Sequence, residues 1–270
     1  MATKTNKLTK TKIACDLGVS RQSLYYKSKQ KSKDEQLKEA ILSVLSTHKS
    51  YGYRRIALAL KINKKRVQRL MHKFRIRPYK RKVRWKKRLD LRREPMPYTN
   101  LIKDRFPIRE GLVYASDFTY LPYKGQFIYL ATVMDLYTRE VVGWEMSQRH
   151  DSNLVLNAFI NGLYNNGFRL PKVIHSDQGS EYCSKQYIKF LNHLGIRISM
   201  SKKSSPWENA YQESYYSNFK TDLGLEFDRF EGLGELIEGV HQTINYYNKD
   251  RIHTSLKMSP SVFAKLHKSV

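Results

Sequence analysis

Three carboxylates stand out because of where they fall in the amino-acid sequence. Asp117 lies inside the run SDFTYL, Asp177 follows the run KVIHS, and Glu213 lies within WENAYQESYYSNFK. Carboxylates that converge repel one another, and burial raises the cost of keeping them charged. A pair of divalent cations about 3.5–4 Å apart relieves that repulsion and supports an in-line phosphoryl displacement. Magnesium suits a site with few carboxylates, because it keeps water and takes phosphate oxygens as ligands.

The pattern of the second half predicts the elements that hold these acids. Apolar and β-branched runs predict strands over 112–123, 126–137, 140–146, 172–176 and 196–199, with helices over 152–164 and 184–194. The order βββαβαβα is typical of a mixed α/β sheet with helices on both faces. Because central strand ends converge in such a sheet, Asp117 and Asp177 are expected to share a site that Glu213 closes.

The segment around Glu213 reads as a helix with a marked start. Ser205 to Glu208 forms a capping box with proline at the first helical position, so Glu208 is interpreted as a cap. A spacing of about 100° per residue places Tyr211 and Tyr215 on a side that could pack. The opposite side carries Asn209, Glu213, Ser217 and Lys220. On helical spacing alone, that polar stripe is more typical of a solvent-facing surface than of a functional site.

Charge is distributed very unevenly along the chain. The 270 residues carry 50 Lys and Arg against 24 Asp and Glu, a net charge of +26. Residues 1–110 account for +25 of it, and residues 111–270 for +1. This predicts a front half that binds a polyanion, most simply nucleic acid, joined to an ordinary globular half.

Composition excludes several other classes of protein. Apolar residues make up 40% and charged residues 27%, which is atypical of membrane and of disordered proteins. No run approaches the ~18 apolar residues of a transmembrane helix, and the N-terminus lacks the pattern of a signal peptide. Cys15 and Cys183 are too few for a disulfide framework. We therefore expect a cytoplasmic protein without a membrane partner.

The first basic segment predicts a helix-turn-helix within residues 1–30. A helix from Lys10 to Leu17 is followed by a turn, with Ser20 placed to cap a second helix from Arg21 to Lys27. Leu24 is the expected buried anchor of that second helix. Such a helix could enter a DNA major groove with Arg21 and Gln22. An ordinary helical hairpin is the alternative.

A second helical unit is predicted over 34–76. A helix at 34–46 precedes one that contains Ile56, and Asn63 can cap a third from Lys64 to Phe74. The apolar side of this third helix is Val67, Leu70, Met71 and Phe74, and its other face is Lys64, Lys65, Arg66, Arg69 and Lys73. That basic face favours DNA contact, and a solvated surface is the alternative.

A basic arm and a linker, 77–110, join the helical units to the sheet. Ten of the 17 residues from Arg77 to Arg93 are Lys or Arg, without an apolar period. Such an arm suits phosphates, and its aromatic rings could stack on bases. The residues assigned to this contact are Arg84, Trp85, Lys86, Lys87 and Arg88. The remaining predicted boundaries are 111–232 for the sheet domain and 233–270 for a C-terminal helix and tail that pack on it.

Taken together, these segments resemble a known family of mobile-element proteins. Asp177 and Glu213 are separated by 35 residues, and Lys220 follows seven residues after Glu213. This resembles the DDE catalytic core of retroviral-integrase type, and more closely the second-reading-frame product of bacterial insertion sequences of the insertion-sequence-three family. The resemblance spans about residues 10–265 and includes YLATVMDLYTREVVGW, VIHSDQGSEY and YYNKDRIHTSLKMSPSVF.

The resemblance implies a ribonuclease-H-like core preceded by small all-α helix-turn-helix units, and a transposase that cleaves and joins DNA strands. By position, Asp117, Asp177 and Glu213 become the catalytic and metal-binding triad, with two Mg²⁺ ions or Mn²⁺ as an alternative. Lys220 and Asn209 are assigned to DNA contact. Implied partners are the terminal inverted repeats, target DNA, further copies of the chain on DNA, and the first-reading-frame protein or a fusion to it. The implied location is the bacterial nucleoid.

Other readings stay open at this point. A DNA-binding regulator with a silent core, or a ribonuclease-H-like RNA nuclease, would share many of these features. Asp135 and Glu181 are rival acids, and Asp135 is interpreted as a cap of the turn after its strand. Structural and functional roles are balanced for His175, Asn248, Arg251 and His253.

Overall fold

A five-stranded sheet organises the second half of the chain in the structure, a computed structural model. The structure describes residues 9–25, 29–79, 98–103, 107–202, 209–224 and 226–267. The strands are β1 (Val113–Tyr123), β2 (Gln126–Asp135), β3 (Val141–Ser147), β4 (Val173–Ser176) and β5 (Arg197–Met200). Their order is β3-β2-β1-β4-β5, antiparallel through β1 and parallel from β1 to β5. The predicted mixed sheet is confirmed.

The hairpin between β1 and β2 sets the register of the sheet. Lys124 and Gly125 both have positive φ, which matches the two-residue turn that suits the twist of paired strands. Tyr123 then pairs with Gln126, and Asp117 falls opposite Thr132 near the middle of β1.

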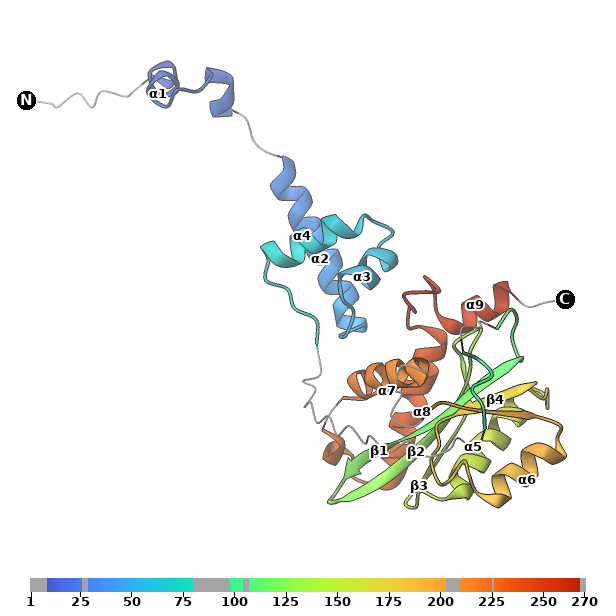
Figure 1. The fold of residues 1–270 in the computed structure, drawn as a ribbon. Coiled ribbons are helices and arrows are strands. Elements are labelled where there is room, and N and C mark those ends of the chain that lie inside the picture. Colours follow the sequence, from blue (N-terminus) through green and yellow to red (C-terminus); the bar gives the residue numbers. More distant parts are fainter. Residues whose placement is uncertain are drawn as a thin grey trace, which may run out of the picture.

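Helices cover both faces of this sheet, as predicted (Figure 1). On one face α5 (Ser152–Asn165) and α6 (Lys185–His193) pack against Tyr114 and Ile174. On the other face α7 (Ala210–Leu223) and α8 (Leu233–Lys249) pack against Leu130. Along the chain, the short elements η3 (Phe227–Arg229) and α9 (Pro260–Leu266) lie before and after α8. The sheet is therefore buried on both sides, and α7 lies directly over β1 and β2.

The first N-terminal unit differs from its prediction. α1 (Lys10–Asp16) forms as expected, but residues Arg21–Tyr25 form the 3-10 helix η1 in place of an α-helix. Ser20 does cap this segment, because its Oγ accepts from the Ser23 amide at 3.3 Å. Leu24 is only half-buried and Leu17 is 64% exposed. A short helix needs tertiary packing to persist, and this one has little.

The second helical unit matches its prediction closely. It contains α2 (Lys29–Thr47), α3 (Tyr53–Ala59) and α4 (Lys64–Lys73) around Ile41, Ile56 and Leu70. The Asn63 side chain accepts from the Lys65 amide at 2.8 Å, which confirms the cap.

This second unit docks onto the C-terminal part of the chain. His48 Nδ1 and the Tyr246 hydroxyl are 2.8 Å apart, and Ser50 donates to Asp222 at 2.6 Å. Arg55 Nε donates to the Ile252 carbonyl at 3.0 Å, and the Tyr51 hydroxyl accepts from the Ile252 amide at 2.7 Å. Residues 233–267 thus hold the helical unit as well as packing on the sheet. No helix in the described ranges is long and apolar enough to cross a membrane.

Candidate active site

Asp117, near the middle of β1, and Asp177, just after β4, both follow the segment over which these two strands pair in parallel. Ala115 on β1 pairs with His175 on β4, and each aspartate stands two residues beyond that pair. Asp177 Oδ1 accepts from the Gly179 amide at 2.9 Å, and Asp117 Oδ1 accepts from the Phe118 amide at 2.8 Å. The parallel register therefore brings Asp117 and Asp177 to corresponding positions on neighbouring strands, as predicted.

Gly179 leaves room for the acids around it. A Cβ at this position would lie 2.9 Å from Glu181 Oε2 and 3.1 Å from Asp177 Oδ1. Real Cβ contacts are rarely that short, so a methyl group would push at least one carboxylate aside.

Since the family resemblance implies DNA cleavage at these acids, we expect Gly179→Ala to lower that cleavage without unfolding the protein. Misplacing a reacting group by about 1 Å can cost on the order of 10²-fold in rate, and the methyl group would act on a carboxylate side chain. Single-turnover cleavage and circular dichroism measure the two quantities. Gly195→Ala, whose Cβ would meet nothing within 4 Å, controls for glycine replacement, although its positive φ adds backbone strain. Full activity of Gly179→Ala would mean that the Asp177 turn has no influence on the chemistry.

Glu213 lies on the first turn of α7, and two neighbours tie that helix to β1. Gln212 Nε2 donates to the Ala115 carbonyl at 2.7 Å, and the Tyr216 hydroxyl donates to the Asp117 carbonyl at 2.6 Å. Gln212 is fully buried and Tyr216 nearly so. Sequence reasoning missed both positioning residues, although their spacing of four marks them as neighbours on one helix face.

Electrostatics link the three acids. Burial raises the pKa of Asp117 to about 7, helped by the negative charges of Asp177 and then Glu213, while the Phe118 amide opposes the rise. Burial also raises the pKa of Asp177, with a contribution from Glu181, against the Gly179 amide. Each shift reports a carboxyl group that is held where its charged form is costly. Such an arrangement favours a cationic guest.

The acids fit a magnesium ion without forming a finished cage. Among the described residues, no group of three or more His, Cys, Asp or Glu side chains is arranged to hold a metal ion. Magnesium is commonly bound through one or two carboxylates, with water and substrate phosphates completing the shell. Asp117, whose buried carboxyl group is costly to ionise, and its neighbour Asp177 match that requirement. The exposed Glu213 on α7 adds a further negative charge.

The rival acids have other work in the structure. Asp135 Oδ1 accepts from the Tyr137 amide at 2.7 Å and the Thr138 amide at 3.1 Å, so its predicted capping role is confirmed. Glu181 is 6% exposed and lies 2.7 Å from His150 Nδ1. Glu181 therefore borders Asp177 but is already engaged.

Lys220 and Asn209 lie at opposite ends of α7. Lys220 Nζ donates to the Tyr120 carbonyl at 2.8 Å and lies over the Tyr120 ring, 4.8 Å from its centroid. Tyr120 is on β1, three residues after Asp117. The Lys220 ammonium therefore contacts the strand that carries Asp117. Asn209 is the N-cap of α7 and is 6% exposed.

The predicted DNA-contacting residues are divided by the structure. Lys64, Lys65 and Arg66 are exposed on α4, and Arg21 and Gln22 are exposed on η1. Arg69 and Lys73 instead bind Asp34, which is 1% exposed, at 2.7 Å each. These two cations thus contribute to the packing of the second unit, which sequence reasoning did not foresee. Arg84, Trp85, Lys86, Lys87, Arg88 and Glu208 lie outside the described residues.

Packing explains most of the remaining polar residues. Asn248 exchanges two hydrogen bonds with the Val141 backbone, at 3.0 and 2.9 Å. Arg251 is 2% exposed, with its Nε 2.8 Å from Asp222. His175 is fully buried, with Nδ1 2.9 Å from Ser199 Oγ.

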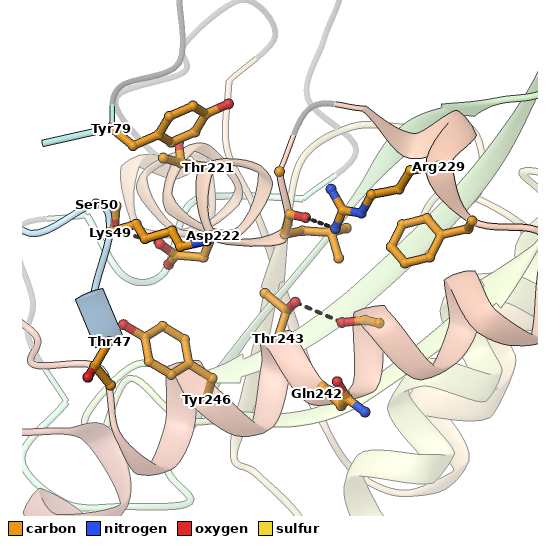
Figure 2. Close-up of a pocket in the computed structure, with 14 residues that line it drawn as sticks. Thr47, Lys49, Ser50, Tyr79, Thr221, Asp222, Arg229, Gln242, Thr243 and Tyr246 are labelled. Carbon is orange, nitrogen blue, oxygen red and sulfur yellow. Dashed lines mark hydrogen bonds between the residues drawn. The ribbon is translucent and has the colours of Figure 1, made fainter. Parts of the chain in front are cut away.

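A groove of about 670 Å³ lies elsewhere, between the end of α2 and helices α7 and α8 (Figure 2). Lys49, Ser50, Asp222, Thr243 and Tyr246 are among the residues that line it. Its walls include the docking contact between Ser50 and Asp222, and none of the three candidate acids. The groove is therefore a feature of the docked helical unit rather than the candidate active site.

Comparisons with known proteins agree with this fold. The family model described as integrase core domain matches residues 108–206, and a second model with the same description matches residues 194–260. A simian T-cell lymphotropic virus intasome, solved in complex with PP2A regulatory subunit B56 gamma, has a chain that aligns with a TM-score of 0.53 at 17% identity. That alignment covers 86% of this chain and 75% of the chain in that complex. At that identity it supports the fold alone.

Transposase relatives are more similar in sequence than these viral structures. The transposase for insertion sequence element IS904 of Lactococcus lactis is 35% identical over 248 residues, which cover 88% of this chain and 97% of that protein. The transposase InsF for insertion sequence IS3A of Escherichia coli is 36% identical over 128 residues, 47% of this chain and 44% of that protein.

Proposed function

Since this chain belongs to the IS3 family of insertion-sequence DDE transposases, we propose that Asp117, Asp177 and Glu213 are its catalytic carboxylates. The chain is a polynucleotidyl transferase with an integrase-type core, and it acts on DNA. The observation that carries the assignment is geometric: Asp117 and Asp177 each lie two residues beyond the paired Ala115 and His175, and α7, which carries Glu213, is tied to β1 beside them. The raised pKa of Asp117, caused by burial and by the charges of Asp177 and Glu213, agrees with this placement.

The reaction consists of two phosphoryl transfers. A water oxygen attacks a phosphorus atom at the element end, the 3′ oxygen leaves, and the freed 3′-hydroxyl then attacks a phosphodiester of another strand. No covalent bond to the protein is needed, so positioning and charge stabilisation supply the catalysis. Gln212 and Tyr216 hold α7 against β1, which keeps the first turn of α7, with Glu213, close enough for its charge to act on Asp117.

We propose Mg²⁺ as the metal, with Mn²⁺ as a substitute and two ions in each site. Asp117 and Asp177 would hold the ions, with Glu213 as the third acid. When bound, a pair of such ions activates the attacking oxygen and stabilises the leaving oxygen. Asp117 and Asp177 must both be charged for this purpose, which their surroundings resist until a cation arrives.

The DNA substrates are proposed to be the terminal inverted repeats of the element and a target duplex. The exposed Lys64, Lys65 and Arg66 on α4, together with Lys220 near β1, are proposed to contact phosphates. Two element ends must meet during strand transfer, so we propose that copies of the chain assemble on DNA. The first-reading-frame protein, or a fusion to it, would supply further end recognition.

Metal-dependent nicking of end DNA tests the proposal. We expect strand nicks on duplexes that carry the inverted repeat when Mg²⁺ is present, and none with EDTA. A DNA-binding protein with a silent core would bind these duplexes without nicking them under either condition. Stronger cleavage of an RNA–DNA hybrid than of duplex ends would instead identify an RNA nuclease.

We expect the basic arm to supply affinity more than sequence choice. Ten cations within residues 77–93 suit phosphates rather than base edges. If the front half contacts roughly six to ten phosphates, affinity should fall by about 10³–10⁵ between 50 and 200 mM salt. Replacing Lys86, Lys87 and Arg88 with Ala should weaken end and random DNA alike, and lower the salt slope by up to about three.

Arg21→Ala is the matched comparison for the arm variant. Arg21 is exposed on η1, in the predicted helix-turn-helix, and its loss should weaken end DNA selectively. Salt titrations of both variants on both DNAs give the answer. An arm variant that loses only end-specific binding, with an unchanged salt slope, would make the arm a reader of bases.

A further inference from the structure

A small pocket lies between α7, the turn after β2 and the chain that follows α8. Its volume is about 160 Å³. The lining residues are Met134, Arg139, Tyr211, Ser214, Tyr215, Asn218, Tyr247, His253 and Ser255. None of them is acidic, and the pocket is separate from the groove of Figure 2.

Three polar groups that line this pocket have buried atoms without a hydrogen-bond partner in the described structure. They are Arg139 Nη1, the Tyr215 hydroxyl and His253 Nδ1. A buried polar atom left unpaired costs roughly 1–3 kcal/mol, so three at one cavity point to a polar guest. Their positions are fixed by contacts elsewhere, since Tyr215 is 2% exposed and the His253 amide donates to the Met258 carbonyl at 2.9 Å.

The positive charges around the pocket favour a negatively charged ligand. Burial lowers the pKa of His253 to about 4, and the positive charges of Arg139, Arg55 and Arg251 contribute to the fall. Arg251 is paired with Asp222, and Arg55 donates to the Ile252 carbonyl. Arg139 lies over the Tyr211 ring, 3.8 Å from its centroid, and no ion pair holds it within the described residues.

Arg139 is presented to the pocket by a rigid turn. Its amide donates to the Asp135 carbonyl at 2.9 Å, and the Asp135 side chain caps the same turn through Tyr137 and Thr138. A guanidinium that is already ordered loses less freedom when it binds a planar or tetrahedral anion. The capping role of Asp135 therefore extends to placing this cation.

We propose that this pocket binds a phosphate-class anion through Arg139, Tyr215 and His253. Arg139 and the Tyr215 hydroxyl donate to the anion, and neutral His253 donates from Nδ1. The cavity exceeds the ~30 Å³ that one water occupies in the liquid, so a phosphate group fits as readily as a few waters. The anion comes either from a DNA backbone or from free phosphate.

This site is independent of the proposed triad. At about 100° per residue, the pocket residues Tyr211 and Asn218 lie on the side of α7 roughly opposite Glu213, and Ser214 is turned about 100° away from it. An anion held there would not touch the reacting atoms. A binding measurement can therefore fail while nicking succeeds, or the reverse.

Phosphate titration of the full chain tests the site. Inorganic phosphate is titrated against chloride at constant ionic strength, while calorimetry and the imidazole NMR signals of His253 are followed. We expect saturable binding and a His253 pKa that rises when phosphate is bound. Arg139→Gln and Tyr215→Phe should weaken this phosphate binding, the first by roughly ten- to a hundredfold, as for loss of a charged hydrogen bond. Arg139 has a φ of 65°, and Gln, like Arg, has an unbranched side chain, so Arg139→Gln should not change the cost of this backbone conformation.

Arg197→Gln is the matched control, because Arg197 is an exposed arginine on β5 outside the pocket. Its phosphate affinity should equal that of the unaltered chain. If a random-sequence duplex displaces phosphate from His253, the anion is a DNA phosphate, and if it does not, the anion is free phosphate. Unchanged His253 signals, or equal binding by Arg139→Gln, Tyr215→Phe and the control, would refute the site and leave water as its occupant.

Discussion

Asp117→Asn, Asp177→Asn and Glu213→Gln should each abolish cleavage of end DNA while leaving its binding largely intact. Each change removes one metal-binding charge and little volume, so the sheet and α7 should keep their packing. The expected loss in single-turnover rate is on the order of 10⁴ or more, the scale seen when one member of a catalytic set is removed. Gel-shift assays on the same duplex report the binding.

Asp135→Asn is the matched control for this experiment. Asp135 is buried on a neighbouring strand and accepts backbone hydrogen bonds, yet it is not among the charges that act on Asp117. It should keep substantial activity, although a weaker turn cap could lower stability. Glu208→Gln should behave likewise, because Gln also serves in a capping box. Retained cleavage in a triad variant with Mg²⁺, or complete loss in a folded Asp135→Asn, would show that the triad is misassigned.

The sheet and its acids could be predicted because local pattern and global topology agree. Alternating and continuous apolar runs define β1 to β5, and a parallel register brings residues two beyond Ala115 and His175 to one end. Asp117 and Asp177 follow from that geometry alone. The role of Glu213 could be recognised only through the family resemblance, because helical spacing by itself favours a solvent-facing stripe.

Features that depend on partners distant in sequence could not be predicted. Arg69 looked like part of a basic DNA face, but its charge is engaged by Asp34, 35 residues earlier. Gln212 and Tyr216 act through backbone carbonyls of β1, which no side-chain pattern records. None of the residues of η1 itself is buried, and so little packing does not fix a short segment as an α-helix.

The second large effect concerns stability in the absence of metal, where Asp117→Asn should make the protein more stable at neutral pH. The pKa of Asp117 is about 7 in the folded chain, against about 3.9 for an unfolded aspartate. The folded state therefore binds the proton more tightly, so ionisation destabilises it. The penalty is absent below pH ~4, grows as pH rises toward 7, and is constant above that.

Asparagine removes this penalty, because it carries no charge at any pH in the range. The gain in free energy of unfolding should be roughly 2–3 kcal/mol at pH 8, less than the full shift implies because the side chain is not fully shielded from solvent. Urea unfolding of both proteins at pH 4, 6 and 8 in EDTA measures it. The two curves should nearly coincide at pH 4 and separate progressively toward pH 8.

With magnesium, the unaltered chain should become more stable than Asp117→Asn. This reversal would link the ionisation penalty at Asp117 to its proposed role in metal binding. A ligand that binds only the folded state stabilises it by RT ln(1 + [L]/Kd), so saturating Mg²⁺ should raise the stability of the unaltered chain. Asp117→Asn should gain much less, because it has lost one of the charges that hold the ion. If the difference in free energy of unfolding between the two proteins in EDTA did not change with pH, ionisation of Asp117 would not destabilise the folded chain. Metal binding would then not relieve such a penalty. Equal stabilisation of both by Mg²⁺ would place the ion elsewhere.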